Sequence, residues 1–426
     1  MSPAHRAISW TNRHDRLFLW TARLPVAPTY GYSAHALDTS VAVLGSTGSI
    51  GTSTLSVIEH LGPPWRAIAL SAHRQTKLLL EQVDRFKPSA VAVTDPAAYN
   101  AVCSQLSGKP VTVYAGPQGL VDMVQRDDVD VVLAAIVGSA GLPAVIAAIE
   151  AKKKLALANK EALVVAGSLV IPLARKLGVS ILPVDSEHSA VFQAMQAGKP
   201  EQVRRVILTA SGGPFRNATH DQIENATLSD ALNHPTWRMG SKITIDSATM
   251  FNKALELIEA CWLFDIPPEK IEIVIHPESL VHSMVEFIDG SVIAQLSPPD
   301  MRTPIQYALT YPDRADGCSR RLDLVKAFSM TFQPPDVQRF PAIGVAYDVA
   351  RKGGTAGAVL NGANEAAVAA FMKGRIRFGQ IARIVCHTIG AHQVRQSPTL
   401  GDLVEADRWA RATAESYMTD RTLVSV

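Results

Sequence analysis

Residues 41–185 alternate short runs of β-branched and apolar residues with longer stretches of helical pattern. The strand-like runs read VAVL, RAIALSA, SAVAVTD, PVTVY, VDVVLAAIV, KLALAN and VSILPVD. This rhythm is typical of a parallel sheet whose crossover helices cover both faces. Further along, a strand-like run at 203–211 and a predicted helix at about 248–264 precede three more strand-like runs, the last two joined by a hairpin at 289–290. The sequence therefore predicts an α/β fold.

Shifts in composition mark the other parts of the chain. Residues 1–40 are rich in arginine and poor in acids, and we expect them to form a disordered extension. Residues 211–241 form a long segment with several Gly and Pro residues, which is typical of a loop that closes over a site. Residues 311–337, rich in Pro, Arg and Asp, read as a linker. The remainder, residues 338–426, is predicted to form a small helical domain.

The bulk composition excludes several classes of protein. A formal net charge of +2 gives no global field that would favour nucleic acid or an anionic membrane. The four cysteines lie far apart without a CxxC pair, which argues against a thiolate metal site and favours a reducing cytoplasm. Residues 131–149 mimic a membrane span, but their internal Gly and Pro favour a strand, a turn and a helix. The arginine-rich extension leaves a plastid location, through a transit peptide, as the alternative.

The first predicted strand runs directly into GSTGSIG, so Gly45, Gly48 and Gly51 lie between a buried strand and a helix. Small residues there let a pyrophosphate approach the backbone at the helix N-terminus, where free N–H groups and the helix dipole favour an anion. Because the spacing is GxxGxxG and not GxGxxG, an ordinary tight turn is the alternative. The position of the motif, in the first strand–helix unit of the predicted sheet, favours a dinucleotide site.

The end of the second predicted strand bears on the choice of cofactor. It carries His73, Arg74 and Gln75 and no acidic residue. An acid at this point would bind the ribose hydroxyl of NAD, whereas an arginine accommodates the extra phosphate of NADP. We therefore predict NADP, with a solvated arginine of no special role as the alternative.

The strand at 182–184 leads into Asp185-Ser186-Glu187. In an extended segment, residues i and i+2 point the same way, so both carboxylates would face one ion. Hard cations such as Mg²⁺ and Mn²⁺ prefer oxygen ligands. The alternative is that Asp185 or Ser186 caps the helix that follows.

A second constellation lies in SATMFNKALELIEA. Ser247 is predicted near a helix N-terminus, and Asn252, Lys253 and Glu256 share one helix face. A hydroxyl, an amide and a cation at a helix start suit a phosphate group, and Glu256 would add a third carboxylate to the metal. A surface helix with a Lys–Glu pair is the alternative. Ser211 and the two glycines after it offer a further anion cradle.

With these motifs, the sequence resembles the 1-deoxy-D-xylulose 5-phosphate reductoisomerase family from about Val41 to the C-terminal helices. The matching blocks are GSTGSIG, ALANKEALV, LPVDSEHSAVFQ, TASGGPF, ALNHPTWRMGSKITIDSATMFNKALELIEACWLF, IHPESLVHSMVEFIDGSVIAQLSPPDMRTPIQYAL and LNGANEAAVAAF. The resemblance implies a Rossmann-like NADP domain at 41–185, a central α/β catalytic domain at 186–310 that carries the flap 211–241 and a homodimer interface, and the helical domain. The departures are residues 1–40 and 73–75.

The resemblance also implies roles for individual residues. Asp185, Glu187 and Glu256 would bind Mg²⁺, Mn²⁺ or Co²⁺, while Lys160, Glu187 and His234 would act in catalysis. The residues expected to bind substrate are Ser186, Glu187, Ser211, His234, Trp237, Ser247, Asn252, Lys253 and Glu256. The residues expected to bind NADPH are Thr47, Gly48, Ser49, Ile50, His73, Arg74, Gln75, Asn159, Lys160, Glu161 and Gly240.

The implied activity is the rearrangement and NADPH-dependent reduction of 1-deoxy-D-xylulose 5-phosphate, in the non-mevalonate route to isoprenoid precursors. A metal chelated by two substrate oxygens would stabilise the charge that develops as the carbon skeleton rearranges. The rival functions are a metal-independent NADP dehydrogenase, a non-catalytic NADP-binding module, and a ketol-acid reductoisomerase, whose substrates carry a carboxylate and no phosphate. Three carboxylates and a helix face suited to phosphate favour the reductoisomerase activity over these rivals.

Overall fold

The computed structural model describes residues 39–325 and 328–419. The extension predicted to be disordered, and its alternative reading as a transit peptide, lie outside the described residues except for Thr39 and Ser40, which begin the first strand. None of the helices in the described ranges is long and apolar enough to cross a membrane. The span-like run at 131–149 divides, as predicted, into a strand, a 3-10 turn at Ser139–Gly141 and a helix.

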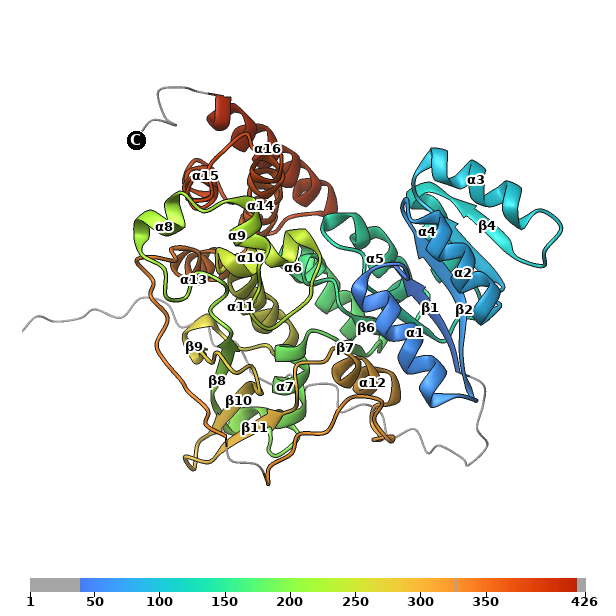
Figure 1. Cartoon of the computed structure of the whole chain (residues 1–426), viewed down its shortest axis with the longest axis horizontal. Coiled ribbons are helices and arrows are strands. Elements are labelled where there is room, and N and C mark those ends of the chain that lie inside the picture. The colour runs from blue at the N-terminus through green and yellow to red at the C-terminus, as the bar shows by residue number, and fades with distance from the viewer. Residues whose placement is uncertain (1–38, 326–327, 420–426) are drawn as a thin grey trace, which may run out of the picture.

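The first part of the chain forms a seven-stranded parallel sheet in the order β4-β3-β2-β1-β5-β6-β7 (Figure 1). Its strands are β1 Thr39–Leu44, β2 Trp65–Ala72, β3 Ala90–Val93, β4 Thr112–Ala115, β5 Val131–Ala134, β6 Lys154–Leu157 and β7 Ile181–Pro183. The predicted parallel sheet is therefore confirmed. Strand order reverses beside β1, and this places a crevice outside the carboxyl ends of β1 and β5, where nucleotides bind in such folds.

Helices cover both faces of this sheet. They are α1 Ser49–Leu61, α2 Thr76–Phe86, α3 Pro96–Leu106, α4 Gly116–Val124, α5 Leu142–Glu150 and α6 Lys160–Leu177. Alternate residues of β1 face opposite cores, because successive side chains of a strand point to opposite faces. Val41 and Val43 join the core under α1, α2 and α3, whereas Ala42 and Leu44 join the core under α4, α5 and α6.

The central part is built on a four-stranded sheet in the order β11-β10-β8-β9. Its elements are α7 Ser186–Met195, β8 Val203–Ala210, α8 His220–Glu224, α9 Leu228–Leu232, α10 Ser241–Ala248, α11 Phe251–Phe264, β9 Ile271–Ile275, β10 Val281–Phe287 and β11 Val292–Leu296. The hairpin predicted at Asp289 and Gly290 is confirmed, since it joins antiparallel β10 and β11, with Gly290 at φ +86°.

The helix predicted from about 248 to 264 is α11, which begins slightly later, at Phe251. A second helix, α10, precedes it and was not predicted, and Met250, in the left-handed region at φ 64°, separates the two. The residues of α10 include the β-branched Ile243, Thr244 and Ile245, which weakened the helical signal. The predicted flap, residues 211–241, is not a bare loop either, because it contains the short helices α8 and α9.

The last part is helical, as predicted, with α13 Ala342–Lys352, α14 Ala356–Met372, α15 Gln380–Gly390 and α16 Leu400–Thr419. The described residues of 311–337 contain no helix and only an isolated bridge from Gln333 to Ile275. Side chains of α14 and α16, including Val359 and Leu403, complete one core of the first sheet, and Ile305 of α12 (Arg302–Thr310) joins the other. The hydrophobic cores thus cross the predicted domain boundaries, which stay a prediction.

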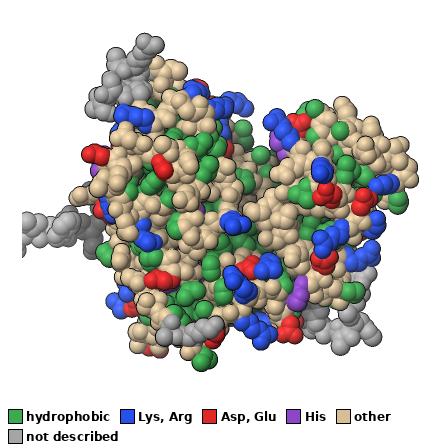
Figure 2. Space-filling model, viewed as in Figure 1, with side chains coloured by type: hydrophobic (Ala, Val, Ile, Leu, Met, Phe, Trp, Pro, Cys, Tyr) green, Lys and Arg blue, Asp and Glu red, His purple; other side chains and the backbone are tan. Residues whose placement is uncertain are grey.

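Charged side chains are spread over the surface. On the face drawn in Figure 2, lysine and arginine side chains are interspersed with aspartate and glutamate, and no large patch carries one sign. This distribution agrees with the low net charge of the chain.

Candidate active site

The predicted nucleotide loop follows β1 at the carboxyl edge of the first sheet. Gly45 has φ +79°, and a Cβ there would lie 2.8 Å from the carbonyl oxygen of Ala135. A Cβ at Gly51 would lie 2.2 Å from the carbonyl oxygen of Gly45, so both positions require glycine. Gly48 is the N-cap of α1 and provides no side-chain cap, which leaves first-turn N–H groups available to an anion. Thr47, Ser49 and Ile50 complete the loop and are at least partly exposed.

Three buried residues that the sequence analysis missed hold this loop in place. The Ser46 hydroxyl donates to Gln82 Oε1 at 2.7 Å, and the Gly45 N–H donates to Ser71 Oγ at 2.8 Å. Ser46 lies inside the glycine motif, so its small polar side chain was a usable signal. Gln82 and Ser71 come from neighbouring elements, and nothing local marks them.

The predicted NADP-selecting residues follow β2, the strand next to β1. His73, Arg74 and Gln75 are all exposed. Arg74 Nε donates to Asp95 Oδ2 at 2.8 Å, and this contact lowers the pKa of Asp95, yet the arginine side chain is 76% exposed. Arg74 is therefore accessible to an anion at the same sheet edge as the glycine loop.

The three predicted metal ligands converge. Oxygen atoms of Asp185, Glu187 and Glu256 all lie within 4.8 Å of one another. The local geometry predicted for Asp185-Ser186-Glu187 was wrong, because these residues are not extended: Asp185 caps α7 and accepts from the Glu187 N–H at 3.2 Å. The capping alternative is realised, and the carboxylates converge from a helix cap, the first turn of α7 and the second turn of α11. Ser186 Oγ donates to Glu187 Oε2 at 2.5 Å.

Two lysines lie among these carboxylates. Lys160 Nζ is 2.5 Å from Asp185 Oδ2 and 2.9 Å from Glu256 Oε1, and it donates to Asn252 Oδ1 at 3.0 Å. Burial opposes its charged form, but Asp185, Glu256 and Glu259 outweigh burial and hold the pKa of Lys160 well above its usual value.

The second lysine, Lys253, contacts Glu256 and lies 3.3 Å from Glu187 Oε1. Burial, together with the charges of Glu256 and Asp185, raises the pKa of Glu187 to about 7, although Lys253 opposes the shift. A buried cluster with this many carboxylates favours additional positive charge. Because Asp185, Glu187 and Glu256 all offer carboxylate oxygens as ligands, these residues fit a hard divalent cation.

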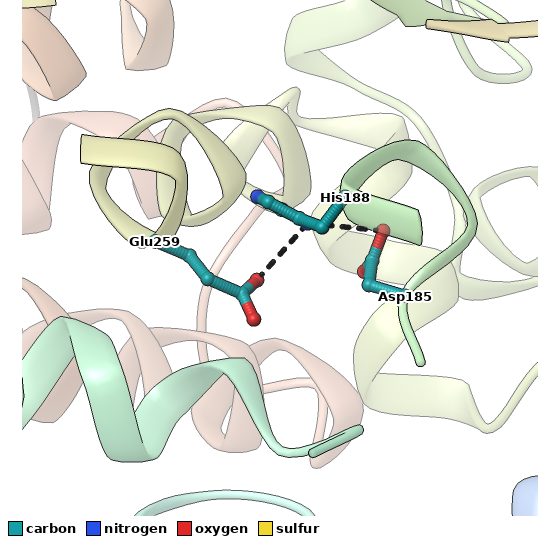
Figure 3. A group of neighbouring side chains, drawn as sticks. All are labelled: Asp185, His188 and Glu259. Atoms are coloured by element: carbon teal, nitrogen blue, oxygen red, sulfur yellow. Dashed lines mark ion pairs between the residues drawn. The ribbon is translucent and has the colours of Figure 1, made fainter. Parts of the chain in front are cut away.

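His188 and Glu259 stand behind this cluster and were missed by the sequence analysis. Figure 3 shows the imidazole of His188 between the carboxylates of Asp185 and Glu259, with Nδ1 at 3.4 Å and 3.3 Å from them. Nε2 lies 2.9 Å from the carbonyl oxygen of Glu256, which can only accept, so Nε2 carries a proton. Burial opposes protonation, but Glu259 and Asp185 raise the pKa of His188 to about 9. The imidazolium therefore forms an ion pair with Asp185, in the position that outer partners of metal ligands take.

His234 joins two of the predicted phosphate-binding residues. Its Nε2 is 3.1 Å from Ser211 Oγ and 3.1 Å from Ser247 Oγ, while its Nδ1 accepts from the N–H groups of Thr236 and Trp237. Burial lowers the pKa of His234, so the ring is neutral and Nε2 carries the proton.

Ser247, which was predicted near a helix N-terminus, lies in the last turn of α10, close to the start of α11. A Cβ at Gly213 would lie 2.7 Å from the carbonyl oxygen of Ser247, so the 211–213 loop packs directly on this junction.

The remaining predicted residues frame the site. Asn159 caps α6, and Lys160 and Glu161 form its first turn at the carboxyl edge of the first sheet. Gly240 begins α10. Trp237, on the flap, is half-buried, and its ring centroid lies 6.1 Å from that of His282. Burial lowers the pKa of His282 to about 4, so the Trp237 indole meets a neutral ring.

The chain matches known proteins over the same regions that build this site. The family model described as 1-deoxy-D-xylulose 5-phosphate reductoisomerase matches residues 41–167, and models of the family's C-terminal domains match residues 181–264 and 296–413. The 1-deoxy-D-xylulose 5-phosphate reductoisomerase of Chlorobaculum tepidum is 50% identical over 379 residues, which cover 89% of this chain and 99% of the relative. The protein of the same name from Pelodictyon phaeoclathratiforme is 49% identical with the same coverage.

Solved structures agree with the sequence relatives. The structure of 1-deoxy-D-xylulose 5-phosphate reductoisomerase from Zymomonas mobilis in complex with NADPH is 45% identical, with a TM-score of 0.84, and the match covers 90% of this chain and 99% of that one. A structure of DOX-P reductoisomerase in complex with NADPH, fosmidomycin and magnesium is 40% identical, with a TM-score of 0.84 and coverage of 89% and 98%. This chain therefore belongs to the 1-deoxy-D-xylulose 5-phosphate reductoisomerase family.

Proposed function

We propose that this chain rearranges 1-deoxy-D-xylulose 5-phosphate and reduces it to 2-C-methyl-D-erythritol 4-phosphate, with NADPH and a divalent cation as cofactors. The observation that carries the proposal is the convergence of Asp185, Glu187 and Glu256. Two of these carboxylates, Asp185 and Glu256, contact Lys160, which begins the helix after β6 at the edge of the nucleotide sheet. A metal-independent dehydrogenase or a non-catalytic NADP-binding module has no need of three converging carboxylates. The solved relative with NADPH, fosmidomycin and magnesium supports the same cofactors.

The carboxylate cluster would serve the rearrangement. A divalent cation held by Asp185, Glu187 and Glu256 would supply Lewis-acid stabilisation of negative charge on substrate oxygens. Lys160 lies within hydrogen-bond distance of two of these carboxylates, so its ammonium orients them and can donate to a substrate oxygen.

The His234 cluster would hold the substrate phosphate. Ser211 and Ser247 offer hydroxyl donors on either side of the His234 Nε2–H group, and all three can donate to phosphate oxygens. Asn252 and Lys253 extend this donor set from the first turn of α11. Binding energy from a phosphate remote from the reacting carbons can drive closure of the flap.

The direct test is an assay of the purified protein with 1-deoxy-D-xylulose 5-phosphate, NADPH and Mg²⁺. We expect loss of NADPH absorbance together with formation of 2-C-methyl-D-erythritol 4-phosphate. Turnover should be lost in excess EDTA and recovered when Mg²⁺ or Mn²⁺ is added. A 2-hydroxy-3-keto acid without phosphate should not be turned over. Absence of turnover, or full activity in EDTA, would contradict the proposal.

Cofactor choice gives a first prediction. The protein should use NADPH in preference to NADH, and Arg74→Asp should lower that preference about tenfold or more, since one charge-assisted hydrogen bond contributes about 1.5–3 kcal/mol. Arg85→Asp is the matched control, because Arg85 is also exposed and paired with an acid, Glu59, but lies at the far end of α2. The measurement is kcat/KM for both cofactors. Equal efficiency with NADPH and NADH in the parent protein would refute NADP selection.

The flap gives a second prediction. If residues 211–241 close over bound substrate, NADPH, Mg²⁺ and a phosphonate substrate analogue together should slow proteolysis in this segment about tenfold or more, because cleavage follows the population of the open form. Residues 311–325 and 328–337 are the internal control and should be cut at the same rate with and without ligands. Equal cleavage of the flap in both states would mean that Trp237 is a permanent anchor of the loop, which is the alternative reading.

We also propose that the chain forms a homodimer through β11. This strand is an edge of the four-stranded sheet, and Val292 and Ile293 on it are 48% and 39% exposed. An apolar edge strand favours pairing with a second copy. The parent protein should sediment as a dimer, and Val292→Lys should shift it toward monomer. A monomeric parent at micromolar concentration would contradict this assignment.

We propose a cytoplasmic location because the cysteines form no disulfide bonds in the described part of the chain. Cys103, Cys261, Cys318 and Cys386 all lie in the described part of the chain, and all four are free thiols. Free thiols are typical of proteins in a reducing compartment.

A further inference from the structure

A buried ion cluster next to the candidate active site joins all three parts of the chain. It is centred on Lys242, the second residue of α10, immediately after the flap. Lys242 Nζ lies 2.6 Å from Asp246 Oδ2 and 3.2 Å from Glu161 Oε1. The three side chains are 15%, 1% and 6% exposed, respectively.

We propose that Lys242 is a positioning residue for the reaction: it fixes the start of α6, which carries Lys160, relative to the start of α10, where the flap ends. Lys242 would thereby hold the loops that bind the cofactor in a fixed position relative to the end of the flap. The proposal rests on the proposed function, because Lys242 itself touches none of the residues assigned to the metal or the phosphate.

The arm through Glu161 leads to the cofactor edge of the sheet. Glu161 is the neighbour of Lys160, and its Oε2 accepts from Asn159 Nδ2 at 3.3 Å. Asn159 Nδ2 in turn donates to the carbonyl oxygen of Gly138 at 2.9 Å and contacts that of Ile136. These carbonyls belong to the loop after β5, beside the strand-order reversal where a dinucleotide lies in such folds.

The arm through Asp246 leads to the phosphate residues. Asp246 precedes Ser247, whose hydroxyl contacts His234. The Oδ1 atom of Asp246 accepts a hydrogen bond from Asn364 Nδ2 of α14 at 2.9 Å, so a C-terminal helix also contacts the carboxylate that pairs with Lys242. Of the two acidic partners of Lys242, Glu161 is itself expected to bind NADPH and follows Lys160, and Asp246 precedes Ser247.

Charge neutralisation alone does not account for the arrangement. Burial opposes the charged form of Lys242, but Asp246, Glu161 and Glu365 outweigh it and raise the pKa, so the ammonium stays charged. A buried ion pair is weak support for stability, since well-packed apolar residues of similar volume are often as good or better. What the ammonium adds is a set of directional contacts that join α6 to α10.

The test compares Lys242→Met with Lys242→Arg. Lys242→Met should raise the Kd of NADPH and lower kcat, each by about 10- to 100-fold, because small misplacements far from the chemistry have effects of this size. It should also reduce the ligand protection of the flap against protease. Lys242→Arg keeps the charge and should bring the Kd of NADPH back to within about threefold of the parent value.

Lys154→Met is the matched control. Lys154 is another partly buried lysine, but its Nζ donates to the carbonyl oxygens of Leu309 and Tyr311 at 2.8 Å and 3.1 Å, away from the site. If Lys242 were only structural, both methionine variants would lose thermal stability and neither would change NADPH binding. A double-mutant cycle adds a second readout: Glu161→Gln should weaken NADPH binding in the parent and have little further effect in Lys242→Met.

An unchanged Kd of NADPH and unchanged flap protection in Lys242→Met would overturn the proposal, as would a Lys242→Arg protein that binds NADPH as weakly as Lys242→Met. If Lys242→Met does not fold, Asp246→Asn, which weakens the other contact of Lys242, is compared with Lys242→Arg in the same binding measurement. Failure of the proposed function is a separate result, because it shows as absence of turnover in the parent protein, whereas NADPH binding is measured without turnover.

Discussion

Glutamine in place of Glu256 should lower kcat by about 10³-fold or more, because a metal site contributes several kcal/mol of charge stabilisation and each 1.36 kcal/mol is about tenfold in rate. Glu256 is 1% exposed and contacts Lys160, Asn252 and Lys253, so its carboxylate organises the whole cluster. Steady-state kinetics over a range of Mg²⁺ concentrations measures the loss and the accompanying fall in metal affinity. Asp185→Asn should behave in the same way.

The cofactor supplies one control for this prediction and a distant carboxylate supplies another. The Kd of NADPH should stay within about twofold, since the glutamine amide oxygen can still accept the hydrogen bond that Lys160 donates to Glu256. Glu286→Gln removes a carboxylate that is 5% exposed and pairs with Arg204 and Arg205 on the central sheet, and it should leave kcat unchanged. Near-normal kcat in both Glu256→Gln and Asp185→Asn would remove the metal assignment.

Methionine in place of Lys160 should destabilise the protein by about 3–5 kcal/mol in the absence of divalent cations, the usual cost of leaving buried charges without their partner. Lys160 is 7% exposed and contacts both Asp185 and Glu256. Mg²⁺ at 100 times its Kd should raise the free energy of unfolding by about 2.7 kcal/mol, because a ligand that binds only the folded state stabilises it by mass action. Urea unfolding with EDTA and with Mg²⁺ measures both effects.

The Lys160→Met protein should also lose stability as pH rises. Burial already raises the pKa of Glu187 and Glu259 from 4.5 to about 7, and removal of the lysine charge raises carboxylate pKa values further. Between about pH 4.5 and 7 the folded state then holds more protons than the unfolded state, so the free energy of unfolding falls with increasing pH. In the parent, Lys160 holds the pKa of Asp185 well below its usual value against burial, and that contribution is lost only in acid.

A pH series of unfolding measurements in EDTA separates this effect from a general loss of packing. Lys154→Met also removes a partly buried lysine, but the contacts of Lys154 are backbone carbonyls, so this variant should show no added pH dependence between pH 5 and 7. A Lys160→Met profile parallel to that of the parent would contradict the proposed charge balance.

The sequence was most informative where local pattern decides structure. The first sheet, its glycine loop and the hairpin at Gly290 follow from alternation, spacing and turn chemistry, and the structure has all three. The residues predicted for the metal also meet, although the reason given for two of them was wrong, since Asp185 and Glu187 converge through a helix cap. The pattern identified the residue types and missed the local geometry.

The rest depended on contacts between distant segments. Lys160 and Glu256 are 96 residues apart, and His188 reaches the carbonyl of Glu256 across 68 residues. His188 stands three residues after Asp185, and Glu259 three after Glu256, so a helical reading of both segments would have placed each beside a predicted ligand. That α7 and α11 lie side by side is a matter of tertiary packing, which no local pattern reports.

The shared cores have a consequence for how the chain is made. All seven strands of the first sheet have been synthesised by Pro183, but its cores are finished by Ile305 and Leu309 on one face and by Val359, Leu403 and neighbouring residues of α16 on the other. At about 5–20 residues per second, the ribosome needs roughly 10–40 s to pass from β7 to α16. Throughout that interval apolar surface of the nascent sheet would be without its partners from the C-terminal helices, and we expect removal of α16 to destabilise the nucleotide-binding end of the molecule.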